Sequence, residues 1–312
     1  MKKRLLLLAV AIVTGVSMAF ASPEMGKGEV VKDSAKTAKD YLHAAKQGDA
    51  EAQNNLGNCY YWGIGVKEDQ SKAVMWYRRS AKQGNAKALR NLALCYEKGV
   101  GGLQQSKERA EELYKKAVPG LFSLAEKGDI EAQSSLAICL YIGDGVEAND
   151  TLAVAWFRKA AEKDDAEAQA DLGHCYRYGT GVEQNDSLSA VWYRKAAEQG
   201  YAEAQNIIGL FYFDGQGVEQ DYQKAVEWYR KAAEQKEPDG LTNLGYCYEK
   251  ALGVPKDYQK AVSLYRKAAE LGNSEGQRRL ALCYLHGRGV KMNTKTAAYW
   301  LQKYRENGEE EE

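Results

Sequence analysis

The chain has 312 residues, of which 45% are hydrophobic, 28% are charged and four are proline, so its composition argues against disordered, collagen-like and membrane-embedded classes. Lysine and arginine together number 43, as do aspartate and glutamate, and this balance argues against general binding of nucleic acid or anionic lipid. The length would allow two ordinary domains, but internal repetition has to be considered first.

The first 21 residues have the organisation of a secretory signal peptide. A basic segment at 2–4 precedes an apolar stretch at 5–13, and the A-x-A sequence at 19–21 provides a cleavage site before Ser22. A membrane anchor would instead need an uninterrupted apolar span of about 20 residues. We therefore predict cleavage, a mature chain with a net charge of about −3, and no membrane insertion afterwards. The mature protein would be periplasmic or secreted.

Residues 22–48 comprise a short segment and a predicted capping helix. The stretch SAKTAKDYLHAAKQG, which ends at Gly48, matches the second helix of the repeats that follow it. Lys36, Lys39 and Asp40 would give this helix a polar outer face. A terminal helix of a solenoid needs such a face because no neighbour covers it.

One block of sequence then recurs seven times. LGNCYYWGIGV begins at Leu56 and LGHCYRYGTGV at Leu172, and successive blocks are 36 residues apart except for one interval of 44. A fixed period of this size predicts a solenoid of helix pairs, in which each repeat buries its apolar face against its neighbours. The predicted repeats 1 to 7 span residues 49–84, 85–128, 129–164, 165–200, 201–236, 237–272 and 273–308, and an acidic tail follows at 309–312.

Each repeat carries the signals of two helices. In repeat 1, Ala52, Leu56 and Tyr60 form an apolar stripe at i, i+4 and i+8, and Gly57 allows close helix approach. Asp or Asn precedes most helices, where its side chain can accept hydrogen bonds from free N–H groups. The predicted caps are Asp49, Asn85, Asp129, Asp165 and Asn273 for first helices, and Asp69, Asn149, Asn185, Asp221, Asp257 and Asn293 for second helices. Because nothing alternates with period two, we predict an all-α fold.

The loops and one second helix have unusual backbone requirements. Paired glycines such as Gly63 and Gly65 lack the spacing and the following Lys-Ser/Thr of a phosphate loop, so they indicate interhelical turns with positive φ. Ala251 replaces the first of these glycines in repeat 6, and we expect it to strain or reshape that loop. Repeat 2 is eight residues longer and contains Pro119 and Gly120, where proline predicts a kink or break.

The pattern A-E-A-Q-x-x-L-G-x-C-Y-x-x-G-x-G-V, followed by D-x-x-K-A-V-x-W-Y-R-K-A-A-E-Q-G, resembles the Sel-1-like repeat (SLR), a relative of the tetratricopeptide repeat. The resemblance covers the chain from about residue 36. It implies a right-handed superhelical solenoid of antiparallel helix pairs, with first helices on the concave face, that acts as a non-enzymatic scaffold for a protein or peptide partner. A cysteine-rich branch of the family has been described as penicillin-binding or β-lactamase-like, so weak β-lactam binding or hydrolysis is the alternative, and self-association is a third possibility.

The residues themselves give little support for catalysis. The S-x-x-K motif of serine β-lactamases is absent, and the three histidines are too isolated for a metal site, so we predict no catalytic residues, metal or cofactor. His174 and Cys175 are adjacent on a helix and therefore point about 100° apart, which argues against a dyad.

The cysteines and tryptophans occupy repeated positions and are predicted to be core residues. Equivalent points on stacked helices lie about 8 to 10 Å apart, too far for a disulfide, and the second cysteine per repeat found in the cysteine-rich branch is missing. The cysteines, one in each first helix except that of repeat 5, are Cys59, Cys95, Cys139, Cys175, Cys247 and Cys283. The tryptophans share one second-helix position: Trp76, Trp156, Trp192, Trp228 and Trp300.

Positions that packing leaves free should carry the function of a solenoid. On the first helix these are the equivalents of Asn54, Asn58 and Tyr61, which vary between repeats and mix aromatic, aliphatic and arginine side chains, as interface centres do. We predict a partner-binding concave face made by Tyr61, Tyr141, His174, Arg177, Leu210, Phe213 and Tyr246. The alternative is that several of these side chains pack against the adjacent first helix.

Overall fold

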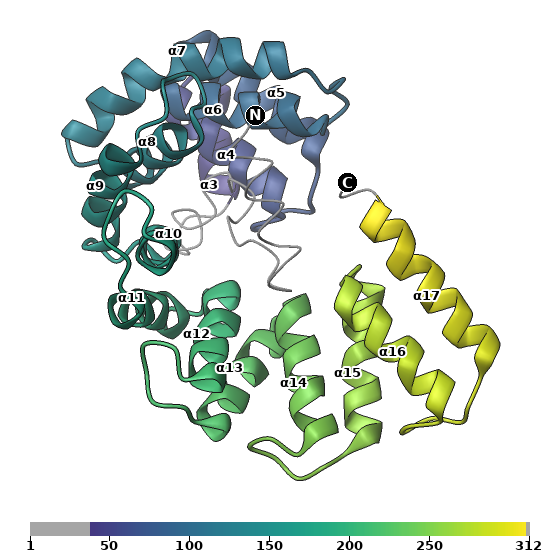
Figure 1. Ribbon diagram of the computed structural model, residues 1–312. Coiled ribbons are helices and arrows are strands. Elements are labelled where there is room, and N and C mark those ends of the chain that lie inside the picture. The colour runs from purple at the N-terminus through teal and green to yellow at the C-terminus, as the bar shows by residue number, and fades with distance from the viewer. Residues whose placement is uncertain (1–37, 310–312) are drawn as a thin grey trace. The chain divides into compact units, whose positions relative to one another are not determined.

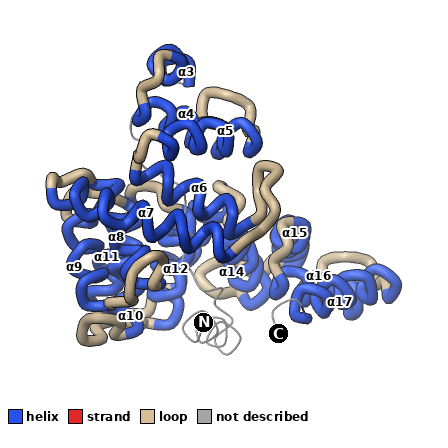
Figure 2. The backbone as a smooth tube through the Cα atoms, turned by 90° about the horizontal axis from the view of Figure 1, so that it is seen from above, coloured by secondary structure: helices blue, strands red, loops and turns tan. Residues whose placement is uncertain are grey.

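The computed structural model describes residues 38–309, and every regular element in that range is an α-helix (Figures 1 and 2). The predicted signal peptide, residues 22–37 and residues 310–312 lie outside the described part. Within the described range no helix combines the length and apolar character needed to cross a membrane. The prediction of an all-α helical-repeat solenoid is confirmed.

The described chain divides into two compact units. The N-terminal unit contains residues 38–175 and 179–183, and the C-terminal unit contains 176–178 and 184–309. The N-terminal unit comprises α3 (Ala38–Lys46), α4 (Ala50–Trp62), α5 (Gln70–Lys82), α6 (Ala86–Lys98), α7 (Lys107–Glu126), α8 (Ile130–Ile142), α9 (Asp150–Ala161) and most of α10 (Ala166–Tyr178). The C-terminal unit comprises α11 (Asp186–Glu198), α12 (Ala202–Asp214), α13 (Tyr222–Glu234), α14 (Pro238–Lys250), α15 (Tyr258–Glu270), α16 (Ser274–His286) and α17 (Thr294–Glu309).

Helices that follow one another along the chain pack together within each unit. In the N-terminal unit α4 packs on α5, α6 on α7 and α8 on α9, and in the C-terminal unit α12 packs on α13, α14 on α15 and α16 on α17. The second helix of one repeat also packs on the first helix of the next, as α13 does on α14. Each repeat is therefore stabilised mainly by its neighbours in sequence, as in other solenoids.

The predicted helix starts are confirmed by hydrogen bonds. The carboxylate of Asp49 accepts from the N–H of Ala52 at 2.7 Å, and the other predicted caps accept equivalent bonds. Tyr201 provides no side-chain cap. In repeat 6 the carboxylate of Glu237 accepts from the N–H of Gly240, a cap that we did not predict, and burial raises the pKa of Glu237 to about 7.

The paired loop glycines have two separate roles. The first, such as Gly63 with φ 69°, ends the helix in the left-handed region, as predicted. The second allows close approach: a Cβ on Gly217 would lie 2.2 Å from the carbonyl oxygen of Asp186, at the start of the preceding repeat's second helix. Ala251 adopts the left-handed conformation with φ 61° and ψ 42°, so the loop of repeat 6 keeps its shape at the cost of backbone strain.

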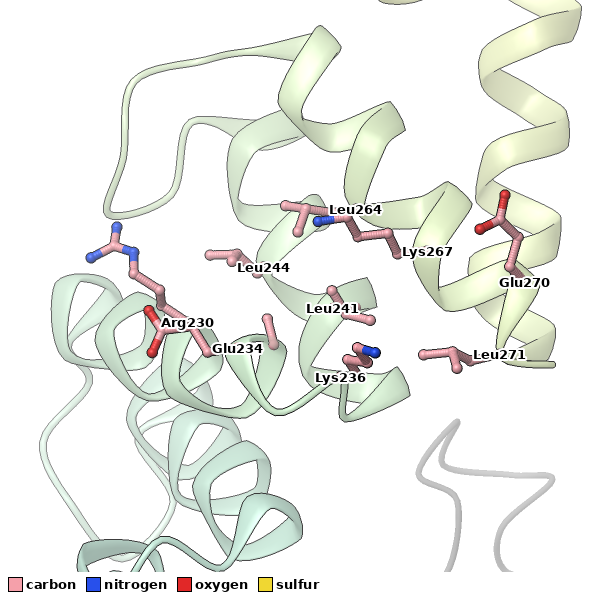
Figure 3. A pocket seen from close by; sticks show the side chains of 10 residues that line it. Arg230, Glu234, Lys236, Leu241, Leu244, Leu264, Lys267, Glu270 and Leu271 are labelled. Atoms are coloured by element: carbon pink, nitrogen blue, oxygen red, sulfur yellow. The ribbon is translucent and has the colours of Figure 1, made fainter. Parts of the chain in front are cut away.

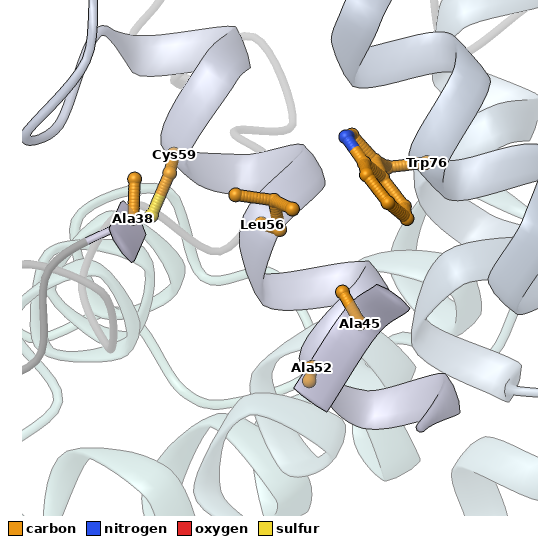
Figure 4. Close-up of a cluster of buried hydrophobic side chains, with 6 residues drawn as sticks. All are labelled: Ala38, Ala45, Ala52, Leu56, Cys59 and Trp76. Atoms are coloured by element: carbon orange, nitrogen blue, oxygen red, sulfur yellow. The ribbon is translucent and has the colours of Figure 1, made fainter. Parts of the chain in front are cut away.

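The recurring Leu-Gly-x-Cys sequence forms the core between helices. Leu56 and Cys59 are buried and belong to one cluster with Trp76 and three alanines (Figure 4). Gly57 leaves room for the ring of Tyr77, because a Cβ at that position would lie 2.5 Å from the ring. The prediction of close packing at this glycine is therefore confirmed.

The six cysteines are free thiols and all are buried, as predicted. Burial raises the pKa of every one of these thiols, to about 12 for Cys95 and Cys247. A thiol with a raised pKa is a poor nucleophile at neutral pH. The cysteines therefore act as small apolar packing residues.

The sequence predicts a kink or a break at Pro119, and the break is wrong. α7 is one continuous helix of 20 residues with Pro119 inside it and exposed. Gly120 lies against the start of α6, where a Cβ would be 2.7 Å from the Cβ of Ala86. Close packing against α6 and α8 holds the helix together through the residue that disfavours it, because tertiary contacts outweigh local propensity.

Candidate functional site

Three of the predicted binding residues lie in the N-terminal unit, and their predicted exposure is wrong. Tyr61, Tyr141 and His174 are only 8%, 4% and 5% exposed. The positions corresponding to Asn54 and Asn58 are buried as well, so first helices in this unit contact one another over a wider face than the apolar stripe indicates. These side chains do not form an accessible surface.

Hydrogen bonds between repeats occupy this buried face. The amide of Asn91 donates to the side-chain oxygens of Asn54 at 3.0 Å and Asn58 at 3.1 Å, and the hydroxyl of Tyr77 donates to Asn58 at 2.8 Å. The two bonds from Asn91 join the first helices of repeats 1 and 2, and the bond from Tyr77 joins the two helices of repeat 1. Their variable polar residues are therefore explained by contacts within the fold.

Two buried ionisable groups extend this polar interior towards repeat 4. Arg90 is 2% exposed and Asp171 is 5% exposed. Burial, with a smaller contribution from Asp165, raises the pKa of Asp171 to about 8, although Arg90 opposes the shift. A carboxyl group with this pKa is largely protonated below neutral pH, so it can donate a hydrogen bond inside the unit.

A lysine links three repeats of the N-terminal unit. The ammonium of Lys87 lies 2.9 Å from carboxylate oxygens of both Asp129 and Glu131, and 3.2 Å from Glu51. Lys87 is 4% exposed and Glu131 is 8% exposed, whereas Glu51 is half exposed. Every other repeat carries a carboxylate at this position, so the one lysine pairs with the acids of both neighbouring repeats.

The structure does bring predicted residues together in the C-terminal unit. Phe213 of α12 and Tyr246 of α14 have ring centroids 6.1 Å apart, and the guanidinium of Arg279 in α16 lies 4.3 Å from the Tyr246 ring. All three side chains are half-buried. We call Phe213, Tyr246 and Arg279, together with Leu210 and Arg177 of the same unit, the aromatic–arginine surface.

Arg177 and Leu210 are anchored within the same unit. The guanidinium of Arg177 lies 5.1 Å from the centroid of the buried Phe211 ring and donates a hydrogen bond to Gln216 at 3.5 Å. Leu210 packs against the cluster that contains Leu244. Both are half-buried, so each keeps part of its side chain accessible.

An ionic cluster borders the aromatic–arginine surface. Glu249 is 8% exposed, and its carboxylate lies 3.6 Å from both Arg279 and Arg288 and 3.4 Å from Lys250. It also accepts a hydrogen bond from the Tyr265 hydroxyl at 2.8 Å. These contacts hold Arg279 in place against the Tyr246 ring.

Arg279 is a surface residue that we did not predict from the sequence. The available signal was an arginine at a position where repeats 1, 2 and 6 have asparagine. In the described residues no group of His, Cys, Asp and Glu side chains is arranged to hold a metal ion. The arrangement favours recognition by ring stacking, apolar contact and charge.

The repeat pattern can be compared with known families. The Sel1 repeat family profile matches residues 50–85, 86–118, 130–165, 166–201, 202–237, 238–273 and 274–308. The chain belongs to the Sel1 repeat family. Repeats of this family typically form scaffolds for protein–protein interaction.

Two solved structures resemble this Sel1 repeat protein over most of its length. The protective antigen c5321 of uropathogenic Escherichia coli strains, which has an SLR fold, is 34% identical over 88% of this chain with a TM-score of 0.60. This chain spans only 57% of that antigen. A Sel1 repeat protein from Oxalobacter formigenes is 27% identical, covers 97% of this chain and 90% of its own, and has a TM-score of 0.60. No curated protein matches the chain.

Proposed function

We propose that this Sel1 repeat protein is an exported, non-enzymatic scaffold that binds a protein or peptide partner through the aromatic–arginine surface of its C-terminal unit. The observation that supports the proposal is the alignment of Phe213, Tyr246 and Arg279 across the first helices α12, α14 and α16. Half-buried aromatic rings and arginine are the residue types that dominate binding energy at protein interfaces.

The charges around this surface favour a partner segment with acidic side chains. The surface itself contains Arg177 and Arg279. The ion-pair cluster around Arg279 adds three cations and two carboxylates, which are Lys250, Arg278 and Arg288 with Glu249 and Glu275, so cations outnumber carboxylates. An acidic group on the partner accelerates its association with a positively charged surface and fixes the orientation in which it binds. An aromatic or aliphatic side chain of the partner would then contact the Phe213 and Tyr246 rings.

Affinity capture from the native compartment tests the proposed surface. Phe213→Ala combined with Tyr246→Ala should greatly reduce recovery of the partner, because each substitution removes an apolar contact from the centre of the surface. The control is Gln223→Ala with Glu227→Ala, which alters exposed residues of α13 and should leave recovery unchanged. Thermal melting ensures that only folded protein is compared, and undiminished recovery with the double aromatic variant would rule out this surface.

Export is proposed from the N-terminal sequence. N-terminal sequencing of the protein from the periplasm and from the culture medium should give a chain that begins at Ser22. The fraction that holds the mature chain distinguishes a periplasmic protein from a released one. Recovery of uncleaved chain in the cytoplasm alone would contradict the proposal.

A further inference from the structure

Repeat 6 lacks the tryptophan that most repeats carry in the second helix. Trp76, Trp156, Trp192, Trp228 and Trp300 share this position, whereas repeat 6 has Leu264. Repeat 2 also has a leucine, but its second helix is longer than the others. Leu264 therefore interrupts the series in a repeat of ordinary length.

The other repeats show where the indole packs. Trp76 belongs to one buried cluster with Leu56 of its own first helix and Ala45 of α3 (Figure 4). Trp300 joins the cluster formed by the equivalent Leu280 and Ala269. In repeat 6 the equivalents are Leu244 and Ala233, and the smaller Leu264 packs there instead.

A groove of about 530 Å³ lies at this place in the C-terminal unit (Figure 3). Leu241 and Leu244 of α14 form its floor between α13 and α15, and charged side chains stand at both walls. Leu271, at one end of the groove, is 49% exposed. The groove is thus an apolar site of the size of a small ligand pocket.

Two further substitutions make this groove apolar. In repeat 5 the corresponding residues are glutamines, and Gln235 donates to Gln205 at 2.9 Å. Repeat 1 has the same pair, with Gln83 donating to Gln53 at 2.8 Å. In repeat 6 the two positions carry Leu241 and Leu271, so an inter-helix hydrogen bond is replaced by apolar surface.

The cation that accompanies the indole is still present. In four repeats the basic residue three positions after the tryptophan lies over its ring, at 4.6 Å for Arg79 and 3.8 Å for Lys231. The equivalent residue of repeat 6 is Lys267, which lines the groove and has no indole on its own helix. Such a cation attracts an aromatic ring placed below it.

We propose that this groove binds a tryptophan side chain presented by a segment of a partner protein. The ring would lie on Leu244 and Ala233, beside Leu264 and below the Lys267 ammonium, as the chain's own indoles lie in neighbouring repeats. The groove is built by the second helices α13 and α15 with the floor of α14. Its occupation is therefore separable from binding at Phe213 and Tyr246 on the first helices.

Methyl NMR of the full chain tests the proposal with N-acetyl-L-tryptophanamide as the probe. Titration should shift the methyl signals of Leu241, Leu264 and Leu271 in the wild type. In Leu264→Trp the introduced indole fills the groove, so the probe should no longer shift Leu241 or Leu271. The spectrum of that variant also reports whether it is folded.

The role of the ammonium has its own control. Lys267→Ala should weaken binding of the tryptophan probe about threefold, which is the size of an exposed cation–π contact. Lys231→Ala removes the same cation from a groove that already holds Trp228, and it should leave probe affinity unchanged. N-acetyl-L-leucinamide should bind more weakly than the tryptophan probe and should be insensitive to Lys267→Ala.

Three results of the probe titrations would overturn the proposal, and a fourth would come from the protein alone. They are an absence of shifts at the groove methyls in the wild type, shifts of Leu241 and Leu271 that persist in Leu264→Trp, and equal affinity for the tryptophan and leucine probes. A shift of the same methyls with protein concentration alone would identify a second copy of this chain as the occupant, and it would also overturn the proposal.

Discussion

Replacing Lys87 by methionine should destabilise the N-terminal unit strongly, because it leaves the buried carboxylate of Glu131 without its ammonium partner at 2.9 Å. Removing one member of a buried ion pair costs about 3 to 5 kcal/mol. We expect the lower end, about 3 kcal/mol, since the other two carboxylates are more exposed and can be rehydrated. Methionine keeps the length of the side chain, so little packing is lost.

Urea unfolding measures this effect through the change in midpoint at constant m-value. Glu131→Gln in the Lys87→Met background should recover at least half of the loss, because a neutral amide is far less costly to bury than a carboxylate that has lost its ammonium. Lys72→Met is the matched control: its ion pair with Asp69 is exposed, and the midpoint should not change measurably. A loss below about 1 kcal/mol for Lys87→Met, or no recovery in the double variant, would refute the reasoning.

Two further predictions concern the backbone and the pH dependence of stability. Ala251→Gly should raise the free energy of unfolding by about 1 kcal/mol because it relieves a left-handed alanine, whereas Gly215→Ala, with φ 74° at the equivalent position, should lower it by a similar amount; thermal melting compares the two. Asp171 binds its proton more tightly in the folded state, since its pKa is raised to about 8, so its contribution to stability is complete below about pH 4 and is lost as the pH rises to about 8. In urea titrations, the free energy of unfolding of Asp171→Asn should therefore rise relative to that of the wild type by up to about 1.4 kcal/mol per pH unit over this range. Parallel plots of unfolding free energy against pH for the two proteins would contradict the assignment.

The repeat architecture was predictable because its signals are local. A capping side chain such as Asp49 lies three residues from the N–H that it binds. A glycine such as Gly63 is needed because that same residue adopts a positive φ. The burial of Cys59 followed from its recurrence at a fixed place in the helix pattern. Pro119 shows the limit of this reasoning, since packing against the neighbouring helices overrode its local preference.

The candidate site was predicted only in part because it depends on how far neighbouring first helices approach one another. The helical pattern identifies the face that carries Tyr141 and His174 but does not give the width of the contact that buries it. Phe213 and Tyr246 are on the same face and stay half-buried. Arg279 joins them through contacts with other repeats, which the pattern within one repeat does not contain.

The close approach at the second loop glycine makes one 36-residue repeat the unit by which this protein can be shortened or lengthened. A Cβ would meet a backbone carbonyl at 2.2 to 2.3 Å at Gly181, Gly217, Gly253 and Gly289 alike, so every such junction presents the same surface to its neighbour. Excising one whole period would rejoin matching surfaces, whereas excising half a period would bring unlike helices together. Engineered versions of different length should therefore be made by adding or removing whole repeats.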